Sequence, residues 1–212
     1  MNPFLYCRTP HDRKHSPAGY SDYSNFKPWL RDEFSFRCVY CLYREAWTQD
    51  GSDSFGIDHV VPKGRDPTQE SEYRNLVYCC RRCNTFKGGQ DLELQLDQLA
   101  LGELFQVDKE GCIAPKNGNP FGEFLIRALQ LDHPKQNQAR RRIFRILEQL
   151  KHHHHLEARH LVNELLGFPR DIPDLAKLAP PNGNMKHGSE QQSCFARKAR
   201  KQLPSTYFCC GQ

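Results

Sequence analysis

A chain of 212 residues has room for one small domain of about 100 to 150 residues with extensions. Only 38% of the residues are hydrophobic and the mean hydropathy is −0.77, so a single apolar core along the whole chain is not expected. The formal charge of +5, from 30 basic and 25 acidic side chains, suits a polyanionic partner but does not establish one. No run approaches the roughly 20 apolar residues of a membrane span, and the first residues lack the apolar core of a signal peptide, so we expect a cytoplasmic protein.

The N-terminal region is predicted to be irregular. Residues 1–30 mix Pro, Ser, Asn, Tyr and charged residues without a clear period. An apolar run that includes Trp29, Leu30, Phe34 and Phe36 then leads into the first cysteine pair. We therefore expect an irregular arm over 1–30 that docks on a core spanning 31–95.

The core is predicted to contain a hairpin followed by a helix. Short β-like runs occur at 54–61 and 76–79, and a polar loop that contains Pro62 and Gly64 separates them. A helical pattern then begins near Arg81 and ends at the glycine pair 88–89. The order strand, strand, helix places the core in the α+β class.

The rest of the chain is predicted to be a helical extension and a tail. Amphipathic patterns suggest helices near 124–131, after Pro134, and over 156–166, within an extension that we assign to 96–175. Residues 176–212 are rich in Gly, Asn, Ser, Gln and basic residues, so they offer little apolar surface for burial. We expect a basic, disordered tail.

Four cysteines form two pairs with metal-ligand spacing, Cys38-x-x-Cys41 and Cys80-x-x-Cys83. Four thiolates can close a tetrahedral site for structural zinc. The pairs are 38 residues apart (42–79), more than the roughly 15 to 20 residues of a simple zinc ribbon, so a further unit lies between them. Cys79 adjoins the second pair, but only Cys80 has the two-residue gap to Cys83.

The segment between and around the cysteine pairs carries a second motif. The sequence runs GIDHVVP at 56–62, continues with Asn75, and runs CRRCNTFKG at 80–88. Residues 36–90 taken together resemble the HNH endonuclease family, which has a ββα-metal fold and, in many members, the same four-cysteine zinc. Many members carry histidine where this chain has Asn84. In this respect it is similar to the HNN variant found in the HNH domain of RNA-guided CRISPR nucleases.

The resemblance implies a role for each matching residue. His59 would be the general base that activates water, and Asn75 would help to hold the loop that carries it. Asp58 and Asn84 would bind a catalytic divalent metal, for which oxygen donors favour Mg²⁺ or Mn²⁺. The chemistry of phosphodiester hydrolysis is consistent with these roles, because histidine is the side chain best suited to accept a proton from water near neutral pH. Lys87 could offer a positive charge to the phosphate.

One geometric requirement follows from these assignments. Adjacent side chains of an extended strand point to opposite faces, so Asp58 and His59 could not both reach one metal from a regular strand. We therefore expect the strand to bend or end here, close to Pro62 and Gly64.

The leading hypothesis is a metal-dependent endonuclease that hydrolyses DNA phosphodiester bonds. The alternatives are a catalytically inactive, zinc-stabilised nucleic-acid-binding module and an RNA-directed nuclease. Contacts to the DNA backbone are expected from basic residues near the second cysteine pair and in the helical extension: Arg81, Arg82, Arg140, Arg141, Arg142 and Arg145. The layout is loosely similar to small HNH effectors of bacterial anti-phage systems, which implies antiviral defence beside a partner protein such as an ATPase.

Overall fold

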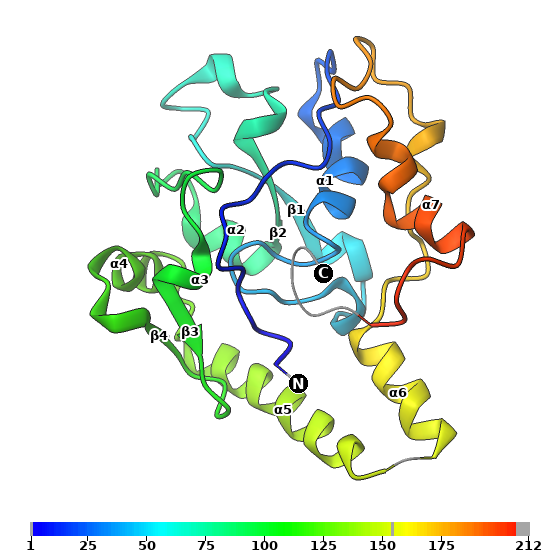
Figure 1. Ribbon diagram of the computed structural model, residues 1–212. Helices are drawn as coiled ribbons and strands as arrows, with labels where there is room; N and C mark the ends of the chain where they lie inside the picture. Colours follow the sequence, from blue (N-terminus) through cyan, green and yellow to red (C-terminus); the bar gives the residue numbers. More distant parts are fainter. Residues whose placement is uncertain (1, 154, 207–212) are drawn as a thin grey trace.

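A β-hairpin followed directly by a helix lies at the centre of the computed structural model, which describes residues 2–153 and 155–206 (Figure 1). Strands β1 (Phe55–His59) and β2 (Leu76–Cys80) are antiparallel, with Phe55 opposite Cys80 and His59 opposite Leu76. Helix α2 (Arg81–Lys87) begins at the next residue and contacts both strands. This arrangement confirms the predicted α+β class with a ββα core.

The hairpin is covered on its other side by α1 (Lys27–Glu33) and by the N-terminal arm. All five residues of β2 are buried, because elements pack against both of its faces, and Trp29 and Leu30 of α1 are fully buried beside it. The arm contributes Phe4 and Tyr6 to the same core, and the Tyr6 hydroxyl donates to the carbonyl oxygen of Tyr40 at 2.8 Å.

Buried acidic residues at the end of α1 fix the arm in place. Glu33 accepts hydrogen bonds from the backbone N–H groups of Lys14 and His15, and the Nε2 atom of His11 lies 2.9 Å from it. Burial alone would raise the pKa of Glu33, but His11, Arg13 and the backbone donor of Lys14 lower it to about 2. The carboxylate therefore stays charged and satisfied inside the fold.

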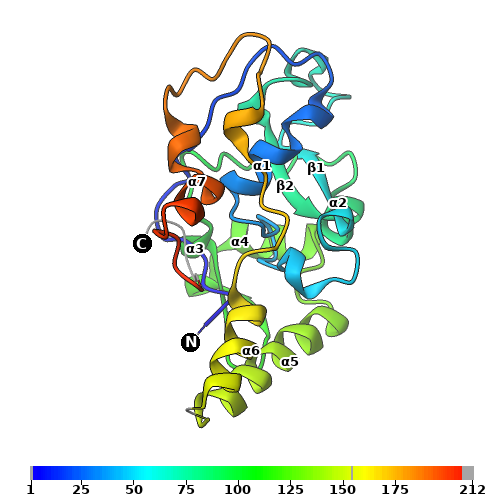
Figure 2. The same cartoon turned by 90° about the vertical axis from the view of Figure 1, so that its right-hand side faces the viewer.

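The helical extension includes elements that the sequence did not predict, namely the short helix α3 (Leu101–Leu104) and a second hairpin of β3 (Phe105–Val107) and β4 (Ile113–Pro115). Its strands have three residues each, too short for a periodic pattern to reveal them. The helices are α3 (Leu101–Leu104), α4 (Pro120–Ala128), α5 (Pro134–Lys151) and α6 (Leu156–Leu166). Helices α5 and α6 lie side by side below the central hairpin (Figures 1 and 2).

Short 3-10 helices connect the larger elements. They are η1 (Tyr23–Phe26), η2 (Glu45–Trp47), η3 (Gly51–Ser54), η4 (Pro67–Gln69), η5 (Tyr73–Asn75), η6 (Lys116–Gly118), η7 (Leu175–Lys177) and η8 (Ser189–Gln192). No helix in the described ranges is long and apolar enough to cross a membrane.

The C-terminal segment differs from the disorder that we expected for 176–212. Residues 176–206 include α7 (Cys194–Ala199) and lie against α1 and the arm (Figure 1). The backbone N–H of Cys194 donates to Asp32 at 2.7 Å, and Asn184 accepts from the backbone of Ser16 at 2.9 Å. Buried polar contacts thus order a segment whose composition suggested none, while residues 207–212 are outside the described part of the chain.

Gly122 in α4 tests how tightly the extension packs. A Cβ atom added there would overlap the carbonyl oxygen of Leu104, which is backbone and cannot move aside cheaply. We expect Gly122→Ala to lower the free energy of unfolding by about 1 to 3 kcal/mol in a denaturant titration. The control is Gly89→Ala, where an added Cβ meets nothing within 4 Å. Equal stability of the two variants would contradict the described packing of α4.

Candidate metal centre and active site

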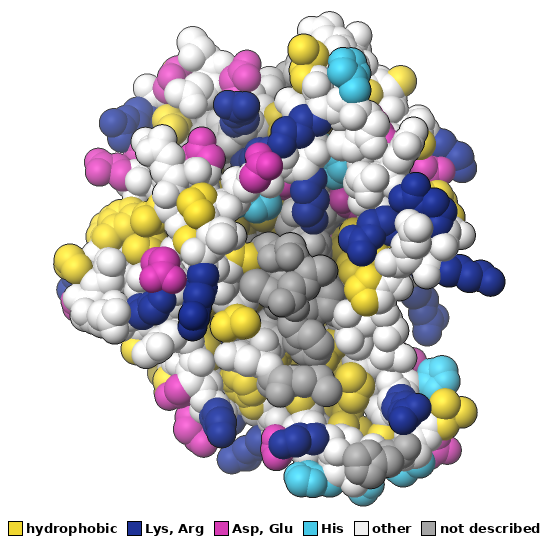
Figure 3. Space-filling view, viewed as in Figure 1, with side chains coloured by type: hydrophobic (Ala, Val, Ile, Leu, Met, Phe, Trp, Pro, Cys, Tyr) yellow, Lys and Arg dark blue, Asp and Glu magenta, His cyan; other side chains and the backbone are white. Residues whose placement is uncertain are grey.

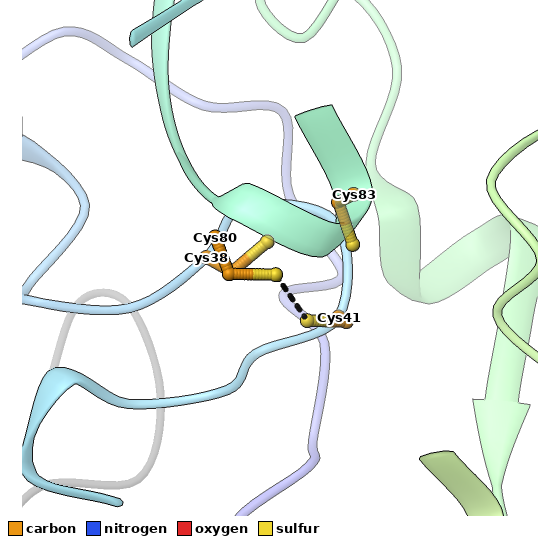
Figure 4. Close-up of side chains that lie close together, drawn as sticks. All are labelled: Cys38, Cys41, Cys80 and Cys83. Carbon is orange, nitrogen blue, oxygen red and sulfur yellow. Dashed lines mark hydrogen bonds between the residues drawn. The ribbon is translucent and has the colours of Figure 1, made fainter. Parts of the chain in front are cut away.

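Four cysteine sulfurs converge at one end of the central hairpin (Figure 4). Their Sγ atoms all lie within 4.8 Å of one another, and those of Cys41 and Cys80 are 3.7 Å apart. Sulfur ligands about 2.3 Å from a tetrahedral zinc would be about 3.8 Å apart, so the cluster has the dimensions of a zinc site. Cys79 is buried elsewhere and is not part of the cluster.

The local structure explains how the four sulfurs meet. Cys38 and Cys41 lie in a tight turn after α1, in which the backbone N–H of Leu42 donates to the carbonyl of Cys38 and Leu42 itself has a φ of 59°. Cys80 is the last residue of β2, and Cys83 follows in the first turn of α2. All four side chains are buried, and this buried donor set suggests structural zinc.

His59 ends β1 at the opposite end of the hairpin. Its Nε2 atom lies 2.9 Å from the carbonyl oxygen of Glu70, which can only accept, so Nε2 carries the proton and Nδ1 is the free acceptor. The ring packs edge-on against Tyr23, with 4.8 Å between the ring centroids, and the residue is 7% exposed. Burial lowers the pKa of His59 below its usual 6.5, so the imidazole is neutral at pH 7.

Asn75 ties together the two ends of the loop that carries Glu70. Its Oδ1 atom accepts from the backbone N–H of Val61 at 2.7 Å, and its Nδ2 atom donates to the carbonyl oxygens of Val61 and Gln69 at 3.0 and 3.1 Å. The carbonyl of Glu70 that holds His59 follows Gln69 directly. Asn75 is therefore positioned to fix the imidazole through the loop backbone.

Asp58 points into the core, where both of its oxygen atoms have partners. The Tyr40 hydroxyl donates to Oδ2 at 2.5 Å, and Lys87 Nζ donates to Oδ1 at 3.1 Å. Burial raises the pKa of Asp58, and the charge of Lys87 and the hydrogen bond from Tyr40 partly offset this effect. Lys87 also donates to the carbonyl of His59 at 2.6 Å and is 1% exposed, so its ammonium group is engaged inside the fold instead of facing a surface phosphate.

Asn84 and Lys87 are three residues apart on α2, and both face β1, as expected. The Nδ2 atom of Asn84 lies 3.5 Å from the carbonyl oxygen of Ile57, and the residue is half-buried. Asp58 belongs to β1 and Asn84 contacts the same strand from α2, and both side chains carry oxygen donors of the kind that a hard divalent ion takes. Both oxygens of Asp58 already accept a hydrogen bond, so an ion held by this carboxylate would share or displace one of these two partners.

The structure does not join the imidazole directly to these donors. Within the described residues, no hydrogen bond or ion pair links the ring of His59 to Asp58 or Asn84. Strand β1 ends at His59, as required, but the alternation of side chains persists up to that residue. Asp58 still lies within electrostatic reach, because its charge acts to raise the pKa of His59.

Sequence reasoning missed three residues of this site. Tyr40 lies between Cys38 and Cys41 in the sequence, which indicates that it is close to the cluster. The sequence does not indicate that its hydroxyl donates to Asp58. Tyr23 covers His59 from the N-terminal arm, and Glu70 acts only through its backbone carbonyl. Any residue type has a backbone carbonyl, so a contact of this kind cannot be predicted from the sequence.

The arginines expected to contact DNA are not equivalent. Arg140 is 2% exposed, and its guanidinium donates to the carbonyl oxygens of Gly111 and Leu131, both at 2.7 Å. The expectation that Arg140 contacts DNA is therefore wrong. An amphipathic pattern does not show that a charged side chain is buried and donates hydrogen bonds to backbone carbonyls. The other five are exposed or half-buried: Arg81, Arg82, Arg141, Arg142 and Arg145.

Residues 38–90 match the model of the HNH endonuclease family. This part of the chain is therefore an HNH endonuclease domain with a four-cysteine metal site, which confirms the resemblance seen in the sequence. A further match is the Septu protein PtuB from Bacillus thuringiensis, 36% identical over 55 residues. That match covers 26% of this chain and 20% of the relative, so the chain spans about a fifth of the relative's length.

Zinc binding can be tested with two neighbouring cysteines. We expect Cys80→Ala to lose the metal, about one zinc per chain in the unaltered protein, and to unfold at lower denaturant concentration, since a structural zinc contributes directly to folding. Cys79→Ala removes a buried thiol next to it but outside the cluster and should retain the metal. The measurement is elemental analysis of the purified proteins. Full zinc content in Cys80→Ala would rule out the four-cysteine site.

Proposed function

We propose that the chain is a metal-dependent endonuclease that hydrolyses DNA phosphodiester bonds with His59 as the general base. The observation that carries this proposal is the bond from His59 Nε2 to the Glu70 carbonyl. It leaves Nδ1 unprotonated and fixes the ring, and the lowered pKa keeps the imidazole ready to take a proton from water at pH 7. Asn75 supports the base through the loop and has no chemical step of its own.

Asp58 and Asn84 are the proposed ligands of the catalytic Mg²⁺ or Mn²⁺. When bound, the ion would supply charge stabilisation at the phosphoryl oxygen. Lys87 keeps the carboxylate of Asp58 in place through its ion pair, so its first role is that of a positioning residue. A direct role of Lys87 at phosphate would require its ammonium group to exchange Asp58 for the phosphate.

The alternative is a zinc-stabilised nucleic-acid-binding module without catalysis. It is favoured by the low exposure of the proposed catalytic residues, of which Asp58 is 4% and Lys87 1% exposed. An RNA-directed nuclease would use the same base and ligands, so the choice of substrate rests on the cleavage assay.

Plasmid nicking separates these functions. With Mg²⁺ or Mn²⁺ we expect conversion of supercoiled to open-circular DNA, and with EDTA we expect no conversion. The rate for His59→Ala should be at least about 100-fold lower, because general-base catalysis contributes about 10²- to 10⁴-fold. The matched control is His160→Ala, an exposed histidine on α6. If the unaltered protein and His59→Ala bind DNA equally and neither cuts it, the binding module is correct. A labelled RNA substrate in the same assay tests the RNA-directed alternative.

The pH dependence of cleavage tests the state of His59. Only the neutral imidazole accepts a proton, so activity should be full above the pKa of His59 and should fall as the pH drops through it. Since burial lowers this pKa below 6.5, the acid limb of kcat/KM should have its midpoint below pH 6.5. The measurement is the initial nicking rate between about pH 5 and 8. A midpoint above 6.5 would contradict the buried, neutral base.

Antiviral defence beside an ATPase is the biological role that we propose. Its support is the local similarity to a Septu protein and the layout of a small nuclease domain with a helical extension. Copurification of a partner with the full chain from its native host would support it.

A further inference from the structure

A groove beside the zinc site is lined by basic and aromatic side chains. A cavity of about 300 Å³ lies between the second cysteine pair and α5, and a larger hollow of about 860 Å³ continues along α5. The two share Tyr43, Lys135 and Ala139, so they form one continuous feature. We call it the α5 groove.

The charge of the α5 groove is of one sign. On the face drawn in Figure 3, lysines and arginines are interspersed with acidic side chains. In contrast, none of the described residues that line the α5 groove is acidic. The side chains of Lys135, Arg142 and Arg145 form no ion pair with any described residue, whereas Arg141 is paired with Glu110 at 3.2 Å. Three positive charges are thus left for an external anion.

The groove also has an aromatic wall. Tyr43 and Trp47 are both half-buried and meet edge to face, with ring centroids 5.1 Å apart. The Trp47 indole N–H donates to the carbonyl of Leu165, which fixes this pair against α6. Arg142 lies close enough to Tyr43 for its charge to act on the hydroxyl. Phosphate-binding charges beside an aromatic platform are the combination found in single-strand binders.

Helix α2 connects the groove to the proposed active site. Arg81 and Arg82 at its start line the cavity, and the Nη2 atom of Arg82 is buried without a hydrogen-bond partner among the described residues. Lys87 at its other end contacts Asp58 and the backbone of His59. Seven helical residues span about 10 Å, so the end of α2 that lines the groove and the end that contacts the proposed active site are about 10 Å apart.

We propose that the α5 groove binds a single strand of nucleic acid, with backbone phosphates on Lys135, Arg142 and Arg145 and one unpaired base against Tyr43. Only one part of this proposal rests on the proposed nuclease function, namely that the bound strand is the substrate. The binding itself is independent of the catalytic residues.

Binding is measured on the full chain in the His59→Ala background without added divalent ion, so that cleavage cannot interfere. The probe is a labelled single-stranded oligodeoxynucleotide of about 12 nucleotides, within the usual range of single-strand sites. We expect Arg142→Ala/Arg145→Ala to raise Kd about tenfold and to reduce the salt slope by about 1.4, since each lost phosphate contact removes about 0.7. The control Arg127→Ala/Arg159→Ala removes two exposed arginines outside the groove and should change Kd less than about twofold.

Tyr43 gives the second readout. Tyr43→Ala should weaken binding of the single strand about tenfold and binding of the matching duplex much less, while Tyr43→Phe should bind like the unaltered protein. An RNA strand of the same sequence is a parallel probe, and its binding with the same dependence on Arg142 and Arg145 also supports the groove.

Three outcomes overturn the proposal: no binding of either strand, equal Kd values for the groove and control double variants, or tighter binding of duplex than of single strand. Failure of the proposed function has a different signature. In that case the unaltered protein does not cut DNA, but the groove variants still lose single-strand binding and the control does not.

Discussion

The convergence of four cysteine sulfurs is the constraint on which the rest of the domain depends. It joins the turn after α1 to the junction of β2 and α2, two segments that are 38 residues apart in the chain. Tyr40 lies inside that turn and donates to Asp58, so the geometry of the cluster reaches the proposed metal ligand through a single side chain. The register of β1 and β2 places Cys80 opposite Phe55 at one end of the hairpin and His59 opposite Leu76 at the other.

His59, the proposed base, is held by backbone groups of its own loop. The Glu70 carbonyl fixes the tautomer of His59, and Asn75 closes the loop with three backbone hydrogen bonds. The same loop brings Lys63 over the ring of Tyr23, which covers His59. The loop therefore orients the imidazole of His59, and Tyr23 of the N-terminal arm covers it.

The sequence predicted what short-range patterns determine. Cysteine spacing identified the metal cluster, alternation and turn residues identified the hairpin, and the motif placed Asn84 and Lys87 on one face of α2. It could not predict the structural contacts of side chains that belong to no motif. Arg140 closes a turn at Gly111, and the tail is ordered by Asp32, because burial of a charged group depends on partners far away in the chain. The strands of β3 and β4 were too short to detect.

The pairing of Asp58 with Lys87 offsets part of the cost of burying a proposed metal ligand. Burial raises the pKa of this carboxylate, which is 4% exposed, and so favours its protonated form, which is a poor metal ligand. The ammonium group of Lys87 opposes that effect and aims Oδ1 toward α2, the helix that also carries Asn84. A lysine one turn after Asn84 thus favours the charged form of Asp58, which is the form that the proposed metal-binding role requires.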